Sequence, residues 1–393
     1  MVMSVSLSNN LASVDLQAAC RPIAVSVYPA RDWSQVAPLW SELWRSSPYS
    51  SVYLSPHWIA AWLETFAALL PVEILVFEEG AAAVGACLLV SSSERRGPFR
   101  IRRIYLNTGG GPPADRSMME FNNLLCRAGF EQKIARALGA HLRSRKWEEF
   151  AIEGICPGPI LSWLQTDLSS EFPASITTRP SFYVDLNRLR RSGLSYESWL
   201  SPNTREQLRR SLRLYEKLGA VRAEAARDLP TAEEFFAEMC RMHQSTWKRR
   251  GEAGAFASAR KLAFHRTLIR NAFGEGAIQL VRVTAGEEII GILYNFVQKD
   301  KVYFYQSGFH YRPDKRLKPG LVTHVCAIQL CLEAGYEDYD FLAGEARYKK
   351  SLAKDSRPLA WVVFSRPRIK LVLIELLRTV KARITRRREP QAI

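Results

Sequence analysis

Two stretches of this chain show the same order of predicted helices and strands, and that order restricts the folds open to it. In each stretch two helical patterns precede three β-rich runs, which are followed by one more helix and one more strand. The first stretch places them at 32–45, 56–70, 72–78, 84–91, 99–107, 130–145 and 149–153; the second at 231–249, 258–273, 278–284, 288–298, 301–309, 321–334 and 339–342. Three successive strands separated by turn signals predict an antiparallel meander, not a Rossmann alternation of parallel βαβ units. The sequence therefore predicts an α/β (α+β) fold with two tandem units, each a mixed, largely antiparallel sheet flanked by helices.

The repeat is also visible residue by residue. ILVFEEGAAAVGACLLV (74–90) and LVRVTAGEEIIGILYNF (280–296) place two glycines at the same spacing. Gly80 and Gly85 therefore correspond to Gly286 and Gly291, as a turn glycine and a strand glycine. Any hairpin can carry such a pair, but the shared order of elements favours a duplication.

Length and composition permit two cores, because the chain has 393 residues of which 47% are hydrophobic. We expect a disordered N-terminus (1–20), a first unit (21–186), a second unit (187–365) and a basic amphipathic C-terminal helix or tail (366–393). The seven cysteines are scattered, with no CxxC pair, which favours reduced thiols. The first residues lack the pattern of a signal peptide, and no run of 18 apolar residues occurs, so the predicted location is the cytoplasm.

Half of the net charge of +16 lies in the tail. Between Arg366 and Arg388 there are nine lysines and arginines against Glu375 alone, a net charge of +8. Apolar residues are interspersed among them, a pattern typical of an interfacial helix attracted to anionic lipids on the inner face of a membrane. A solvated basic helix packed on the second unit explains the pattern equally well.

An ordered series of short motifs runs through the second half. It comprises Ser201-Pro202-Asn203-Thr204-Arg205, then Gln244-Ser245-Thr246-Trp247, Tyr303-Phe304-Tyr305-Gln306-Ser307-Gly308, Lys318-Pro319-Gly320 and Phe341-Leu342-Ala343-Gly344-Glu345 with Tyr348-Lys349-Lys350. The series resembles the acetyltransferase domain of CelD-type GNAT proteins, associated with bacterial cellulose and exopolysaccharide biosynthesis, and more distantly the FemAB and FemX peptidyltransferases. The resemblance implies tandem GNAT-like domains, the first degenerate, with acetyl-CoA or a longer acyl-CoA as donor and a primary amine as acceptor. An amino sugar of an envelope polysaccharide or a lipid-linked amine is the expected acceptor.

The segment before helix 321–334 is the predicted site for the cofactor. The superfamily's pyrophosphate loop, Q/R-x-x-G-x-G/A, is reduced here to Lys318-Pro319-Gly320. Gly320 lets backbone N–H groups at a helix start approach phosphate oxygens, and Lys315, Arg316 and Lys318 add positive charge. An ordinary Pro-Gly surface turn is the alternative. The glycine run 109–113 stands at the same place in the first unit, which suggests a vestigial cofactor loop.

Acyl transfer to an amine needs a base for the amine and a proton for the leaving thiolate. The resemblance implies Tyr348 as the acid; a packing tyrosine is the alternative. Glu345 could accept the amine proton if burial raises its pKa, or it is a helix N-terminal acid. Lys349, Arg205 and Trp247 are candidate substrate-binding residues. No histidine or cysteine spacing suggests a metal site.

Two other functions stay open. A FemAB-like transferase would use an aminoacyl-tRNA donor, with the basic helix Arg205 to Lys217 facing RNA phosphates. A solvated helix face explains that helix as well, so nucleic acid is not the expected partner. A catalytically inactive scaffold for polysaccharide synthesis would explain the reduced loop at Lys318.

Overall fold

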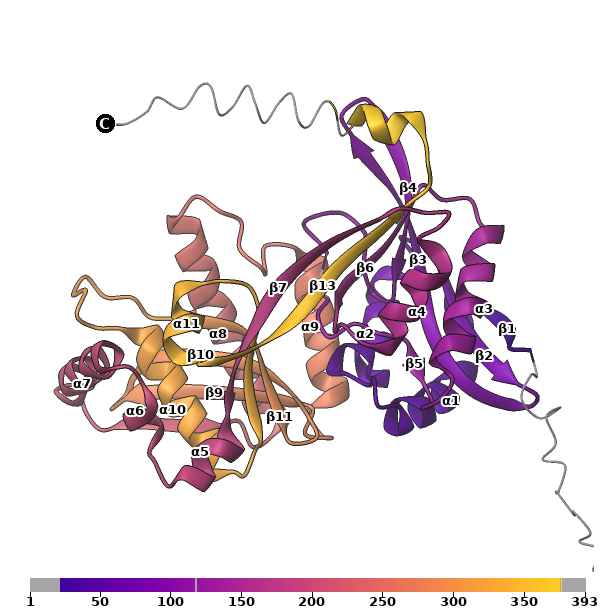
Figure 1. Ribbon diagram of the computed structural model, residues 1–393. Helices are drawn as coiled ribbons and strands as arrows, with labels where there is room; N and C mark the ends of the chain where they lie inside the picture. Colours follow the sequence, from indigo (N-terminus) through magenta and orange to yellow (C-terminus); the bar gives the residue numbers. More distant parts are fainter. Residues whose placement is uncertain (1–21, 117–118, 375, 377–393) are drawn as a thin grey trace, which may run out of the picture.

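The computed structural model describes residues 22–116, 119–374 and 376 (Figure 1). The stretch expected to be disordered, 1–20, and the tail beyond residue 376 lie outside the described residues. In the described part of the chain no helix is long and apolar enough to cross a membrane.

One mixed sheet of thirteen strands runs through the whole molecule. From one edge it begins with β1 (Ala24–Pro29), β2 (Val72–Glu79), β3 (Ala82–Arg96), β4 (Phe99–Leu106) and β6 (Glu149–Ile155), and the short β5 (Leu125–Cys126) pairs with β3. From the other edge it begins with β8 (Val221–Ala225), β9 (Ile278–Ala285), β10 (Glu288–Gln298), β11 (Lys301–Phe309) and β12 (Asp338–Ala343). Strand β4 is parallel to β6, and β11 is parallel to β12; the neighbouring pairs on each side are antiparallel. The two series are arranged alike, which confirms the predicted mixed α/β fold of tandem type.

The two central strands come from distant parts of the chain. Strand β7 (Ala174–Asp185) and strand β13 (Asp355–Ser365) are antiparallel and lie between β6 and β12 (Figure 1). Strand β13, the last of the chain, pairs with β6 of the first half, whereas β7 pairs with β12 of the second half. The strand at 355–365 was not expected from the sequence. The boundary between the two units at residues 186 and 187 stays a prediction. The sheet crosses this boundary, because β13 pairs with β6 and β7 pairs with β12.

Helices cover both faces of this sheet. In the first half they are α1 (Trp33–Ser46), α2 (Pro56–Phe66), α3 (Glu131–Ser144) and α4 (Pro159–Leu168), with 3₁₀ turns at Ala30–Asp32 and Val52–Leu54. In the second half they are α5 (Leu186–Ser192), α6 (Tyr196–Trp199), α7 (Pro202–Glu216), α8 (Leu229–Arg249), α9 (Ala259–Ala272), α10 (Pro319–Glu333) and α11 (Arg347–Leu352). Side chains at their N-termini explain several starts: Ser55, Ser201 and Asp228 each accept a backbone hydrogen bond, and a proline stands in the first turn.

One of the three hydrophobic cores joins the two halves. It buries residues of α1 and α2 together with residues of α8 and α9, and the rings of Trp58 and Phe264 meet edge to face at 5.0 Å. The other two cores lie under α3 and α4 and under α10. Because apolar area is buried between the halves, we expect them to unfold together.

The two glycine pairs lie at matching places. Gly80 and Gly286 have φ values of 63° and 57° in the turns β2–β3 and β9–β10. Gly85 and Gly291 lie beside a register shift in each hairpin. A Cβ on Gly85 would approach Ile134 of α3, and one on Gly291 would approach Thr323 of α10. Both strand glycines thus permit a helix to pack closely on the sheet.

Candidate functional site

A cavity of about 1280 Å³ opens where β11 and β12 separate. These parallel strands pair only from Lys301 and Asp338 to Tyr303 and Asp340. Beyond that point, residues 304–307 and Phe309 line one side of the cavity and residues 341–343 line the other, and residues of α8, α10 and α11 complete the wall. The separation of two parallel strands therefore creates the space for a ligand.

Six of the nine predicted site residues line this cavity: Tyr348, Lys349, Trp247, Lys315, Lys318 and Gly320. The other three, Glu345, Arg316 and Arg205, are not among its lining residues. The structure thus brings together Trp247 of α8, residues at the start of α10 and residues of α11. Their roles stay predictions.

The N-terminus of α10 faces the cavity. Lys318 is its N-cap, and Pro319 and Gly320 are its first residues. The first N–H groups of a helix have no intrahelical partner and favour an anion. A Cβ on Gly320 would lie 3.3 Å from the Phe309 ring, so the helix start packs tightly here. The helix start thus offers backbone donors to a phosphate group.

Several cations around this helix start lack an acidic partner. Lys315, Lys318, Arg250 and Arg347 all line the cavity, and none makes an ion pair within the described residues. Arg312 and Lys350 also line it but are paired, with Glu288 and Glu345. The unpaired cations can bind the negative charges of a phosphate-bearing ligand.

Glu120 is the acidic side chain of the cavity, and sequence reasoning missed it. It comes from the first half, between β4 and α3, and is only 2% exposed. Burial raises its pKa to about 7, although the N–H of Ala343 and the ammonium of Lys349 favour its charged form. A carboxyl group with such a pKa can gain and lose a proton near neutral pH.

The end of β12 is held in an unusual conformation around this carboxylate. Leu342 has a φ of 62°, which is rare for a residue with a branched side chain. Asp340 Oδ1 accepts hydrogen bonds from the N–H of Leu342 (2.7 Å) and from Ser181 (2.6 Å). Lys349 Nζ donates to the carbonyl oxygens of Leu342 (2.9 Å) and Ala343 (2.6 Å). These bonds turn the Ala343 N–H toward Glu120.

Tyr348 stacks on a buried histidine. Its ring lies 5.7 Å from that of His324 with an interplanar angle of 16°. Although the Tyr348 side chain is 40% exposed, desolvation around its hydroxyl and the nearby Glu120 carboxylate raise the pKa of Tyr348, so the hydroxyl stays protonated at neutral pH. Burial lowers the pKa of His324 to about 3, and the Lys349 ammonium adds to this effect. His324 is therefore a neutral platform for the tyrosine.

Two other histidines near the cavity are also neutral. His243 Nδ1 lies 2.9 Å from the carbonyl oxygen of Ser307, and its Nε2 accepts from the N–H of Ala255 at 3.1 Å. These contacts require the proton to be on Nδ1. His265 is fully buried, and burial holds its pKa well below the usual value. Its Nε2 lies 3.2 Å from the hydroxyl of Tyr305, a lining residue. Neither ring is free to act as a base.

Strand β11 carries a bulge at the cavity. Tyr294 is opposite Gln306, and Asn295 is opposite Phe304, so Tyr305 has no partner in the β10 ladder. A bulge leaves the extra residue unpaired and reorients its backbone. The backbone N–H groups around Tyr305 are therefore candidates to bind a carbonyl oxygen in the cavity.

The predicted role of Glu345 depended on a pKa raised by burial, and this condition is not met. Glu345 is exposed and accepts a hydrogen bond from Lys350 at 2.7 Å, and this partner lowers its pKa. Arg316 is bound to Asp314 at 2.8 Å, and Arg205 donates to the carbonyl oxygen of Leu200 at 3.4 Å. Solvent and a basic neighbour keep Glu345 ionised, which makes it a weak base.

Among the described residues there is no cluster of three or more histidine, cysteine, aspartate or glutamate side chains that could hold a metal ion. The six cysteines in the described part have free thiols.

Comparisons with known proteins agree with this architecture. FemX is similar over 83% of this chain and 95% of its own, with 10% identity and a TM-score of 0.54. A conserved protein of unknown function from Bacteroides thetaiotaomicron VPI-5482 covers 87% and 99%, with 9% identity and a TM-score of 0.51. L-PGS from Bacillus licheniformis covers 86% and 95%, with 10% identity and a TM-score of 0.51. No curated protein matches by sequence.

At these identities the structural likeness concerns the fold alone. The sequence itself carries a more specific signal in the second half, which holds the cavity. Residues 202–350 match the family model described as "Acetyltransferase (GNAT) domain".

Proposed function

We propose that this protein is an N-acyltransferase that transfers an acyl group from acetyl-CoA or a longer acyl-CoA to a primary amine. One observation carries the proposal: the buried Glu120 carboxyl and the N-terminus of α10 line the same cavity. The first supplies a base near neutral pH, and the second supplies an anion site. Acyl transfer from a coenzyme thioester to an amine needs both.

The donor binds at the start of α10. Its pyrophosphate accepts from the N–H groups that follow Pro319, and Lys315 and Lys318 neutralise its charge. Arg250 and Arg347 are available for further phosphate groups. The thioester then lies between β11 and β12, where the strands separate.

In the reaction, the neutral amine attacks the thioester carbon, a C–N bond forms and the C–S bond breaks. Glu120 takes the proton from the amine, directly or through water. Backbone N–H groups at the Tyr305 bulge stabilise the oxyanion. The Tyr348 hydroxyl gives a proton to the departing thiolate, since its raised pKa keeps it protonated. The products are an amide and free coenzyme A.

The acceptor enters from the side of α8. Trp247 and Tyr305 provide aromatic surfaces there, and Lys349 lines the cavity near the Glu120 carboxylate. Aromatic faces of this kind suit a sugar ring, which favours an amino sugar of an envelope polysaccharide. A lipid-linked amine is the other candidate. Residues 369–374 are helical beside the β3–β4 hairpin (Figure 1), and Ile369 and Val372 are 81% and 60% exposed, which suits peripheral contact with an anionic membrane from the cytoplasm.

Calorimetry with acetyl-CoA and a long-chain acyl-CoA tests the proposal. The native protein is compared with Gly320→Glu, which places a negative charge at the start of α10, and with Gly274→Glu, at a glycine that has open space around it. We expect saturable binding that is lost only in Gly320→Glu. If neither donor binds to the native protein, the proposal is contradicted.

A second candidate donor is an aminoacyl-tRNA. Helix α7 contributes Asn203, Thr204 and Gln207 to the cavity wall, Arg210 is exposed on it, and the exposed Lys217 is its C-cap. This basic face next to the cavity is the observation that favours it. Salt-sensitive tRNA binding without coenzyme A binding supports this candidate. An inactive scaffold binds neither donor.

A further inference from the structure

A second cavity, of about 1040 Å³, lies in the first half of the molecule. It is bordered by the C-terminal part of β3, by the middle of β4, by the segment after α2, by residues 111–113 and by one arginine of α9. We name it the arginine groove, because six arginines line it: Arg95, Arg96, Arg102, Arg103, Arg116 and Arg260. Lys146 is a seventh cation of its wall.

The carboxylates of the groove do not balance these cations. Glu94 lines the groove, and Glu148, Glu149 and Asp115 pair with its arginines from outside. Seven cations against four carboxylates leave an excess of three positive charges. Glu153 also lies near Arg116 and Arg103, but burial raises its pKa, which disfavours its charge.

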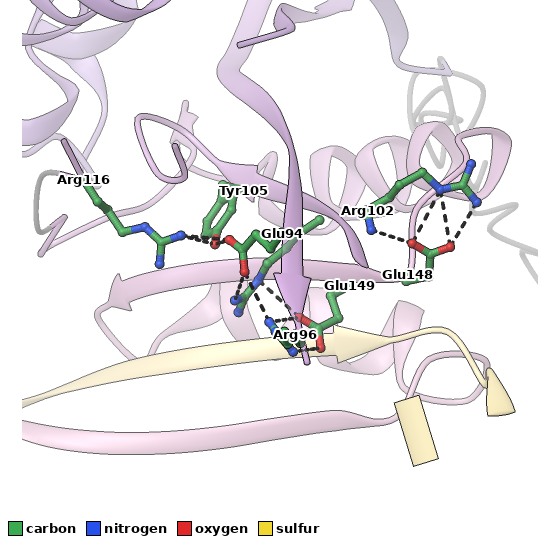
Figure 2. A network of polar contacts seen from close by, with 8 residues as sticks. Glu94, Arg96, Arg102, Tyr105, Arg116, Glu148 and Glu149 are labelled. Atoms are coloured by element: carbon green, nitrogen blue, oxygen red, sulfur yellow. Dashed lines mark hydrogen bonds and ion pairs between the residues drawn. The ribbon is translucent and has the colours of Figure 1, made fainter. Parts of the chain in front are cut away.

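Glu94 and Glu149 each already contact more than one arginine of the groove. Glu94 contacts Arg116 at 2.8 Å, Arg96 at 3.5 Å and Arg103 at 3.6 Å, and it also accepts from the Tyr105 hydroxyl (Figure 2). Glu149 contacts Arg96 at 2.7 Å (Figure 2) and Arg103 at 3.4 Å. Two carboxylates therefore serve three guanidinium groups.

Some donors of these guanidinium groups remain unused. Within the described residues, the buried Nε atoms of Arg103 and Arg116 have no hydrogen-bond partner, although Arg103 Nε lies 3.4 Å from Glu149 Oε2. The side chains are only 13% and 29% exposed. Holding partly buried, incompletely bonded cations together costs free energy, and the negative charge of an anion in the groove would offset part of that cost.

We propose that the arginine groove binds a small molecule through a phosphate or diphosphate group. Guanidinium groups bind phosphate with two parallel hydrogen bonds, and the excess of three positive charges suits an anion of more than one negative charge. Ser91, Ser92 and Ser93 add hydroxyl donors, while Leu70, Ile104 and Pro112 form an apolar wall for the rest of the ligand.

The groove is distinct from the proposed donor site, yet it lies near it along the chain. Arg116 lines the groove and Glu120 lines the cavity of the second half, and four residues span at most about 14 Å. The proposal does not depend on acyl transfer, because it concerns binding alone.

The test is calorimetric titration of the full chain with inorganic pyrophosphate. All variants carry Gly320→Glu, so that the start of α10 does not contribute. We expect saturable binding that Arg103→Gln and Arg116→Gln each weaken by roughly tenfold or more. Arg136→Gln, an exposed arginine on α3, is the matched control and should change nothing.

Introducing a negative charge into the arginine groove tests the proposal without removing a buried arginine side chain. Ser92 lies directly opposite Arg103 in the β3–β4 ladder. Ser92→Glu should weaken pyrophosphate binding and raise the melting temperature of the unliganded protein, because it neutralises part of the excess charge. An unchanged affinity and an unchanged or lower melting temperature contradict the proposal.

Two sources of the phosphate group are distinguished by a second probe, vesicles of phosphatidylcholine with phosphatidylglycerol. Pyrophosphate binding alone indicates a soluble ligand, and vesicle binding weakened by Arg103→Gln indicates a lipid headgroup. Either result supports the groove as a phosphate site. The proposal is overturned if neither probe binds, or if Arg136→Gln weakens binding as strongly as the groove variants.

Discussion

The Glu120 carboxylate accepts a hydrogen bond of 2.6 Å from the backbone N–H of Ala343, a residue 223 positions later in the chain. The bond connects the loop after β4 in the first half with the end of β12 in the second. It places a carboxyl group with a pKa of about 7 in a cavity otherwise built by the second half. Both halves are therefore needed for the candidate site.

Glu120→Gln tests the proposed base. We expect kcat/KM for amine acylation to fall by about 10²-fold or more, because general bases contribute 10²–10⁴-fold. Acyl-CoA affinity should not change. With the native protein kcat/KM should rise with pH up to about 7, and this rise should be absent in the variant. A variant with full activity and the native pH profile would exclude Glu120 as the base.

The same carboxyl predicts how stability depends on pH. Its pKa is raised from 4.5 to about 7 on folding, so the folded protein binds more protons than the unfolded chain between these values. The contribution of Glu120 to the free energy of unfolding is complete below pH 4.5. It falls by at most about 3 kcal/mol as the pH rises to 7. Urea unfolding at pH 5 and pH 8 should show this loss in the native protein and a smaller one in Glu120→Gln. The prediction would be contradicted if the native protein and Glu120→Gln lost the same free energy of unfolding between pH 5 and pH 8.

Tyr348→Phe keeps the ring that stacks on His324 but removes the hydroxyl. We expect kcat with an alkyl thioester to fall by roughly 10- to 100-fold at unchanged donor affinity. An aryl thioester should be much less affected, since its thiolate leaves without a proton. The same loss with both donors would indicate a packing role.

Lys349 and Lys350 form a matched pair for stability. Lys349 is 8% exposed and donates to two backbone carbonyl groups, whereas Lys350 makes an exposed pair with Glu345. Lys349→Met should lower the free energy of unfolding by about 2 kcal/mol, because charged hydrogen bonds to buried acceptors are lost. Lys350→Met should cost less than about 1 kcal/mol. Chemical denaturation measures both; similar values would contradict the assigned contacts.

Two truncations test the central strands. Removing residues 355–393 deletes β13, which lies between β6 and β7. We expect this chain to lose cooperative unfolding, because both neighbours lose a hydrogen-bonded partner. Removing only 377–393, which leaves every described strand in place, is the matched control. A cooperatively folded 1–354 chain would show that β13 is dispensable.

The sequence alone determined the fold class and the order of the elements that occur in both stretches. Alternation in the strands, turn glycines such as Gly80 and Gly286, and caps such as Ser55 and Ser201 are local signals, so they could be seen without the structure. A helix start after a Pro-Gly turn led to Lys318 and Gly320, and the family resemblance led to Tyr348; all three line one cavity.

Only the tertiary structure decided the rest. The position of β13 depends on pairing with β6 and β7, which are distant in sequence, and no local pattern specifies such a partner. Glu120 has no motif around it; its raised pKa arises from burial between segments more than two hundred residues apart. Glu345 shows the converse, because its position after β12 suggested a base while exposure and Lys350 keep it charged. Burial and long-range pairing are properties of the folded chain, and they decide which acidic residue can serve as a base.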